Sequence, residues 1–324
     1  MTDELSTRGL VKKVAGAAPI PLSGLLLGLA SAGNTFSDHR WSFGFFAFTI
    51  LGILILKIAL DTRTLLAEMS NNGVIGIMCT FPMATSILSL YLVPSVPSVA
   101  YGMWFLSVVL HLALILYFTL LLLPRFKVSM SLPSYFVVYV GIAVNGYIAP
   151  VHGHPLLGEM FVWFGLVSLL LLMPPLFYRA FILRTIPTIL IPTMAIFTAP
   201  SSLVLVAYFV AFDAYEAWVV YLLLTMTLIT YVLVLSLFPR IIKNGFLPTF
   251  SSLTFPMVIS AAAVMRSYVY LSDGGYDVEA LRYVGVMMEA VAVVIVLGVL
   301  VMYVFNYLVK PFQRKEEHPE SEKM

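Results

Sequence analysis

Ten apolar stretches follow one another along this chain, each about as long as a helix that crosses a lipid bilayer. They run over 17–36, 41–60, 73–93, 99–123, 133–150, 156–178, 187–211, 214–238, 245–271 and 281–309. A spanning helix needs about 20 predominantly apolar residues. With 61% hydrophobic and only 10% charged residues, the chain has too little charge to cover a soluble domain. The sequence therefore predicts an all-α integral membrane protein with ten transmembrane helices.

The stretches are arranged in pairs that repeat along the chain. The first helices of successive pairs are expected to begin near residues 19, 76, 133, 188 and 246, a period of about 57 residues. The motif Thr-Phe-Pro-Met-x-x-Ser occurs at 80–86 and again at 254–260, about three periods later. We therefore expect five quasi-repeated helical hairpins in a pore domain over 17–309, with both copies of the motif at the same depth.

The distribution of positive charge predicts the orientation. If the N-terminus is cytoplasmic, all 18 Lys and Arg residues except Arg40, Arg266 and Arg282 fall in cytoplasmic loops and tails. Such loops carry an excess of Lys and Arg in membrane proteins. The sequence therefore predicts a multi-pass protein of the plasma or inner membrane with two cytoplasmic ends, the N-terminal segment 1–16 and the C-terminal tail 310–324.

The two helices of each predicted hairpin differ in composition. The odd-numbered stretches contain Gly, Pro, Ser, Thr and Asn, whereas the even-numbered ones are bulky and apolar. Small and hydroxylated residues permit close helix packing, and irregular backbone at membrane depth is tolerated beside a wet cavity. We expect the odd helices to surround a central pore and the even helices to face lipid. The candidate pore-lining residues are Ser23, Gly24, Thr80, Gly141, Asn145, Thr198, Ser201 and Thr254.

The repeated motif predicts a gate. A proline inside a helix removes a backbone donor and bends the helix, so Pro82, Pro256 and Pro200 are candidate kinks. A bend at mid-membrane would direct Phe81 and Phe255 toward the pore axis, where a hydrophobic ring closes a narrow pore by excluding water. The alternative is an ordinary packing kink with both rings held between helices.

Glu289 is the one acid well inside an apolar stretch, and Arg266 lies on the preceding helix. An acid at membrane depth is a functional candidate, for example in a proton relay. The alternative is a structural pair between Glu289 and Arg266. The sequence contains no nucleophile–base pattern, phosphate-binding loop or metal-ligand cluster, so we expect no enzymatic activity, cofactor or metal site. The net charge of +2 gives no reason to expect a nucleic-acid partner.

Several stretches carry a family resemblance. They are 20–30, 133–145, 199–208 and the segment from Leu237-Phe238-Pro239-Arg240 to Thr254-Phe255-Pro256-Met257. In these stretches the chain resembles the tellurite-resistance/dicarboxylate transporter family of TehA-like bacterial proteins, fungal malate and sulfite transporters and plant slow anion channels. The resemblance implies ten helices in five hairpins around a pore, a homotrimer, and occlusion of the pore by Phe255. It also implies small inorganic or carboxylate anions as partners, with the lipid bilayer as the surroundings.

Three functional hypotheses follow. The first is a small-anion channel or facilitator gated by an aromatic plug. The second is a secondary transporter, proton-coupled or acting in efflux, for C4-dicarboxylate, sulfite or tellurite-type oxyanions. The third is a membrane-embedded enzyme or scaffold without transport. Flux through the purified protein separates the third hypothesis from the first two, and dependence on a proton gradient separates the second from the first.

Overall fold

The computed structural model describes residue 16 and residues 18–62, 76–122, 124, 127–243 and 245–309. Over these residues every regular element is a helix, as the sequence predicts. The α-helices are α2 (Leu22–Thr35), α3 (Arg40–Leu60), α6 (Thr80–Leu92), α7 (Pro97–Leu122), α8 (Ser134–Tyr139), α9 (Val144–Ile148), α10 (Pro155–Phe177), α11 (Ala199–Ala211), α12 (Ala217–Ile242), α13 (Thr254–Asp273) and α14 (Glu279–Val304).

Shorter helices of other types connect or extend them. The 3₁₀ segments are η1 (Ser37–His39), η3 (Val128–Met130), η4 (Gly141–Ala143), η5 (Ala149–His152), η7 (Thr188–Thr198) and η8 (Pro248–Leu253). Two π-helical turns, η6 (Tyr178–Leu183) and η9 (Phe305–Val309), follow α10 and α14 directly. Within the described ranges, eight helices are long and apolar enough to cross a membrane, while α2 and the helix over Gly76–Leu92 are shorter.

The long helices fall into two classes by burial. In the spans that contain α3, α7, α10, α12 and α14, only 28–44% of the apolar segment is buried. In the spans over Ser134–His152, Thr188–Ala211 and Pro248–Asp273 the buried share is 78–83%. Side chains such as Phe45, which is 68% exposed, leave the less buried helices covered with apolar surface. Such a surface suits hydrocarbon rather than water.

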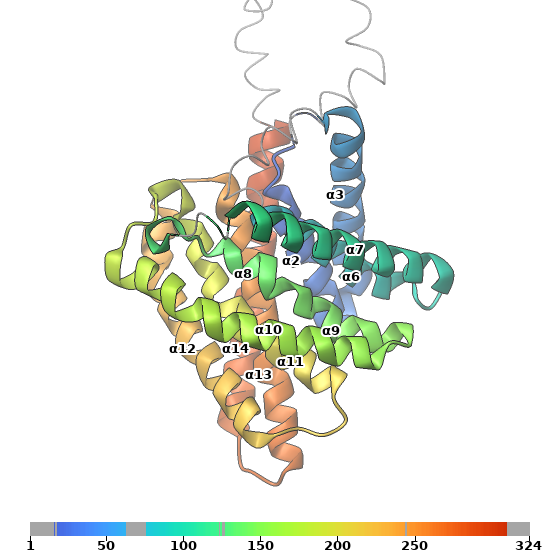
Figure 1. Ribbon diagram of the computed structural model, residues 1–324, viewed down its shortest axis with the longest axis vertical. Coiled ribbons are helices and arrows are strands. Elements are labelled where there is room, and N and C mark those ends of the chain that lie inside the picture. Colours follow the sequence, from blue (N-terminus) through green and yellow to red (C-terminus); the bar gives the residue numbers. More distant parts are fainter. Residues whose placement is uncertain are drawn as a thin grey trace, which may run out of the picture.

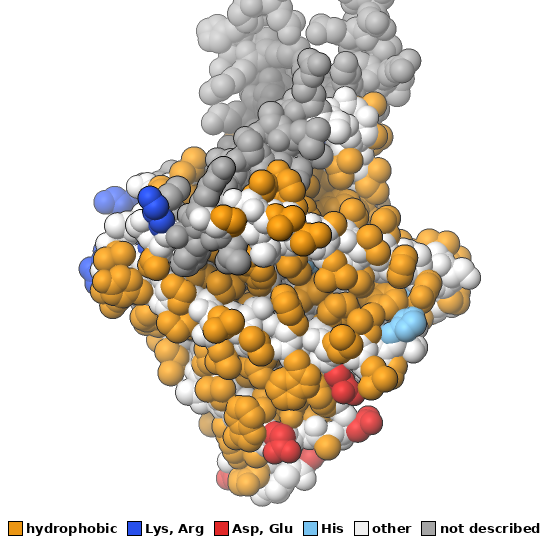
Figure 2. Space-filling view, viewed as in Figure 1, with side chains coloured by type: hydrophobic (Ala, Val, Ile, Leu, Met, Phe, Trp, Pro, Cys, Tyr) orange, Lys and Arg blue, Asp and Glu red, His pale blue; other side chains and the backbone are white. Residues whose placement is uncertain are grey.

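Figure 2 shows how this surface is distributed on one face of the molecule. Hydrophobic side chains cover most of the face, with Lys and Arg gathered at its upper left and Asp and Glu near its lower end. Charges of opposite sign thus lie at different ends of an apolar band, as expected for a protein that crosses a bilayer.

The more buried segments contact one another in a closed cycle. Helix α2 contacts α6, α6 contacts α9, α9 contacts α11, α11 contacts α13, and α13 contacts α2. Each less buried helix packs against two successive members of this cycle, as α3 does on α2 and α6, and α14 on α13 and α2. Figure 1 shows α10 lying across α9 and α11 in the same way. We call α2, α6, α8–α9, α11 and α13, with the 3₁₀ segments that precede them, the inner segments.

Hydrogen bonds between inner segments recur at the predicted repeat period. Thr80 Oγ1 lies 2.7 Å from Ser23 Oγ, 57 residues away. The Ser202 and Ser260 hydroxyls are 3.0 Å apart and 58 residues apart in sequence. Ser86 donates to Asn145 Oδ1 over 2.6 Å, 59 residues away. Each bond therefore joins corresponding positions of successive repeats.

Every inner segment changes its backbone conformation at a corresponding position. Helix α2 begins after a turn at 20–21, α6 begins after a turn at Cys79, η4 separates α8 from α9, η7 gives way to α11, and η8 gives way to α13. Pro82, Pro200 and Pro256 lie in the first turns of α6, α11 and α13. Backbone N–H groups in a first turn have no partner within their helix, so proline costs little there. The three prolines thus lie where turn or 3₁₀ backbone changes to α-helix inside the longer helices Gly76–Leu92, Thr188–Ala211 and Pro248–Asp273, and a kink at each of them stays a prediction.

Candidate functional site

A small cavity of about 50 Å³ lies where the inner segments change conformation. All five contribute to its wall. The lining residues are Gly24, Leu27, Ile77, Thr80, Met83, Phe136, Val137, Val140, Gly141, Ile196, Ala199, Pro200, Leu203, Ser251, Ser252, Phe255 and Pro256. Most of them are apolar, and a cavity of this volume holds at most a few water molecules.

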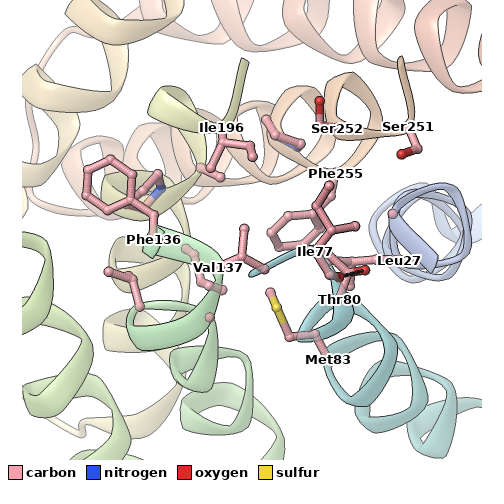
Figure 3. A pocket seen from close by; sticks show the side chains of 17 residues that line it. Leu27, Ile77, Thr80, Met83, Phe136, Val137, Ile196, Ser251, Ser252 and Phe255 are labelled. Atoms are coloured by element: carbon pink, nitrogen blue, oxygen red, sulfur yellow. Dashed lines mark hydrogen bonds between the residues drawn. The ribbon is translucent and has the colours of Figure 1, made fainter. Parts of the chain in front are cut away.

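The Phe255 ring occupies the middle of this site. Figure 3 shows it between Leu27 and Thr80 on one side and Val137 on the other, with Met83 below. Its side chain is only 6% exposed. An ion entering here would lose its water and meet mainly a ring and aliphatic groups, which offer no compensating hydrogen bonds. The hydroxyls of Thr80, Ser251 and Ser252 already donate to other oxygens. With the ring in this position, the cavity is small and mostly apolar.

Close contact between α2 and α13 positions Phe255. The hydroxyl of the preceding residue, Thr254, shares its proton between two acceptors, the Ser251 carbonyl at 2.7 Å and the Gly24 carbonyl at 3.0 Å. At Gly28 a Cβ atom would meet the Thr254 side chain and would lie 3.2 Å from the backbone nitrogen of Phe255. Glycine at this position therefore lets the start of α13 pack directly against α2.

A much larger cavity, about 780 Å³, lies toward the C-terminal ends of α2, α11 and α13. We call it the vestibule. It is lined by Ser31, Asn34, Thr35, Tyr147, Val206, Phe209, Tyr215, Ile259, Ala262, Met265, Arg266, Val269, Tyr270, Asp273, Gly274, Tyr276 and Glu289. Its walls combine hydroxyl, amide and charged groups with aromatic rings, in contrast to the apolar wall of the small cavity.

On α2, α11 and α13, a stripe of residues on one face of the helix lines both cavities. On α13 the stripe runs from Phe255 in the small cavity to Ile259, Ala262 and Arg266 in the vestibule. Residues three or four apart lie on the same face of an α-helix. On α2 the stripe continues in the same way from 24 and 27 to 31 and 34, and on α11 from 200 and 203 to 206. The cavities therefore lie end to end along the axis that the inner segments enclose.

The predicted gate, kink and pore-lining residues divide into two groups. Phe255, Pro256, Pro200, Gly24, Thr80 and Gly141 line the small cavity. Phe81, Pro82, Ser23, Asn145, Thr198, Ser201 and Thr254 are absent from the lining of both cavities. Phe81 is half-buried and packs against the hydrophobic core, so the two phenylalanines of the repeated motif have different surroundings.

The predicted polar residues outside the lining bond to neighbouring segments or to their own backbone. Thr198 donates to the Pro256 carbonyl over 3.4 Å, and Ser201 Oγ accepts from the Thr227 hydroxyl over 3.1 Å. A buried hydroxyl or amide group loses free energy unless it finds a partner, and the contacts between helices supply one. These two bonds connect α11 and its preceding 3₁₀ segment to α12 and α13, and the assignment of Thr198 and Ser201 to the pore lining stays a prediction.

The predicted lining residues are all polar or small, so the apolar residues of the cavity wall are not among them. Leu27, Met83, Phe136 and Leu203 form much of the wall around Phe255. Steps of three or four residues along the helix from Phe255 lead to Ile259, Ala262 and Arg266, which lie on the same face.

Glu289 and Arg266 both line the vestibule. In the part of the chain that the structure describes, no carboxylate oxygen lies within 4.0 Å of an Arg266 nitrogen. The ion pair suggested by the sequence is therefore not formed in this structure. The two side chains instead present opposite charges to the same cavity.

Comparison with known proteins adds one match. A family model described as voltage-dependent anion channel (SLAC1) matches residues 22–304. The search of curated proteins found no match. The matched range begins with the first residue of α2 and ends with the last residue of α14, so it includes both cavities and every inner segment.

Proposed function

This chain belongs to the voltage-dependent anion channel family, and we propose that it is a small-anion channel or facilitator closed by the Phe255 ring. In this proposal ten transmembrane helices form five hairpins around a central pore, and the two short helices, α2 and the helix over Gly76–Leu92, are spanning elements. The closed cycle of contacts among the inner segments supports this arrangement.

The observation that carries the proposal is the position of Phe255. Its ring lies at the narrow point where all five inner segments meet, in line with a vestibule along the same helix faces. A hydrophobic constriction gates by excluding water, because an ion cannot pass without its hydration shell or a substitute for it. Movement of one ring out of the cavity would open a wetted path.

The test is anion flux through purified protein in liposomes, with Phe255→Ala compared with the wild type. We expect the truncated side chain to raise chloride and nitrate flux strongly, because alanine leaves the constriction open. Phe81→Ala is the matched control, since Phe81 occupies the equivalent motif position outside the cavity. Flux in Phe255→Ala no greater than in the wild type, with the protein still folded, would rule out the aromatic gate.

A secondary transporter for C4-dicarboxylate, sulfite or tellurite-type oxyanions is the second candidate. Glu289 favours it, because this half-buried acid on a spanning helix lines the vestibule and could carry a proton. Flux that requires a proton gradient and is lost in Glu289→Gln would establish this candidate over the channel. Because the family is one of channels, a membrane-embedded enzyme or scaffold is the least supported hypothesis.

We also propose that the protein is a homotrimer of the plasma or inner membrane with cytoplasmic termini and an outward-facing vestibule. Cys79 is the only cysteine of the chain and is fully buried, so an introduced cysteine can be labelled selectively. A membrane-impermeant thiol reagent should label Asp277→Cys in intact cells. Labelling that requires permeabilised cells would reverse the orientation, and a mass of one subunit in detergent would contradict the trimer.

A further inference from the structure

We propose that Arg266 is the anion-binding residue of the vestibule and that it loads the pore with small monovalent anions in preference to dianions. This inference rests on the proposed function, because it assigns a substrate class to the same pore. It gives Arg266 a role different from the structural pair with Glu289 that the sequence suggested.

The first argument is position. Arg266 lies on the same stripe of α13 as Phe255, which points into the small cavity, and as Ile259 and Ala262 between them. Eleven residues of α-helix separate Phe255 from Arg266, a rise of about 16 Å. An anion held at Arg266 would therefore be on the pore axis, three helical turns outside the gate.

The second argument is availability. Arg266 is exposed, and across the described ranges no carboxylate lies within 4.0 Å of it. Guanidinium groups present several N–H donors and remain charged at every physiological pH. Asn34, Thr35 and Tyr147 line the same cavity and offer further amide and hydroxyl donors. These are the groups that replace water around an anion.

The third argument is the balance of charge. Arg266 is the basic residue among the lining residues given above, and it is accompanied by two acids, Glu289 and Asp273. Asp273 ends α13, seven residues beyond Arg266, or about 10 Å further toward the rim. The three charges sum to −1, so the vestibule as a whole repels anions, and this repulsion is twice as large for a dianion as for a monovalent anion. Arg266 offsets part of the repulsion for an anion held beside it, which makes the binding weak. Weak binding suits conduction, in which an ion must leave as readily as it enters.

The experiment compares vestibule variants in the conducting Phe255→Ala background, with chloride, nitrate and succinate as probes. Neutralisation in Arg266→Gln should raise the half-saturating external chloride concentration about fivefold, because the local anion concentration falls. Arg266→Lys should keep the half-saturating external chloride concentration close to that of the Phe255→Ala parent. Glu289→Gln is the control of opposite sign and should increase chloride current and succinate permeability. The half-saturating chloride concentration on the cytoplasmic side should not change.

A second readout does not depend on the gate. Val269 lines the vestibule and is 52% exposed, so Val269→Cys in the wild-type background can be modified by thiol reagents. Addition of Arg266→Gln should slow a negatively charged methanethiosulfonate about fivefold and leave a neutral one unchanged. The effect should shrink as inert salt is added, because salt screens exposed charges.

The two readouts separate the inference from the function on which it rests. If Phe255→Ala carries no anion, the proposal that Phe255 is the gate is refuted. The thiol reaction then still tests the role of Arg266. Equal modification rates with and without Arg266 would refute the inference even in a conducting channel. An unchanged half-saturating chloride concentration in Arg266→Gln would also refute the inference. A rise of that concentration in Glu289→Gln would refute it too.

Discussion

Thr254→Val tests whether the contact between α2 and α13 holds the gate closed. The Thr254 side chain is fully buried, and its hydroxyl bridges the Ser251 and Gly24 carbonyls at 2.7 and 3.0 Å. Valine keeps the branched shape of threonine and removes only the hydrogen bond. A hydrogen bond between helices of a membrane protein contributes about 0.6 kcal/mol on average, which corresponds to a factor of about three in an equilibrium constant.

If opening separates α13 from α2, Thr254→Val should raise chloride leak through liposome-reconstituted protein about threefold. Ser267→Ala is the matched control, because its buried hydroxyl lies on the same helix and donates over 2.8 Å to the Ala263 carbonyl. That bond stays within α13, so its loss should not change the leak. Unchanged leak in Thr254→Val would refute the reasoning and would indicate that Phe255 opens by side-chain rotation alone.

Two further substitutions test the packing around the cavity. Gly28→Ala introduces a Cβ atom against the Thr254 side chain, and overpacking of this kind costs about 1–3 kcal/mol, so the thermal unfolding midpoint in detergent should fall. Phe197→Ala removes a fully buried ring whose centroid lies 5.6 Å from that of Phe136 in the cavity wall. It should cost about 3–5 kcal/mol and lower the same midpoint. Phe45→Ala, at a side chain 68% exposed on the outer surface, should leave the midpoint nearly unchanged. Equal effects of the two phenylalanine substitutions would contradict the assignment of buried and lipid-facing helices.

The helical architecture could be predicted because a bilayer imposes simple rules on composition. Apolar length identifies spanning helices. The contrast between small polar and bulky apolar stretches anticipated the difference in burial, 78–83% in three spans against 28–44% in five others. The change from 3₁₀ to α geometry at the start of α11 and α13 was not anticipated. Proline fits both a kink and a first helical turn, and the sequence alone does not distinguish these positions.

The candidate site was predicted less completely, because lining a cavity depends on the rotation of each helix. Phe255 was identified from its motif, and it lines the small cavity. Phe81 has the same neighbours in sequence, but it packs against the hydrophobic core and does not line the small cavity. Side-chain polarity alone does not distinguish a residue at a helix contact from one that lines a cavity. A hydroxyl such as that of Thr198 satisfies its bonding at a helix contact, whereas the cavity wall is formed by residues such as Leu27 and Met83.

The hydrogen bond between Thr254 and Gly24 joins residues 230 positions apart and completes the cycle of inner segments. During synthesis, α2 leaves the ribosome well before α13 has been made. Chains elongate at about 5–20 residues per second, so this interval lasts roughly 10 to 50 s. Throughout it, the face of α2 that carries Gly24 and Gly28 lies in the membrane without its final neighbour. The closing contact is therefore a late step in biogenesis, and substitutions at these glycines should reduce the yield of assembled protein more than its synthesis.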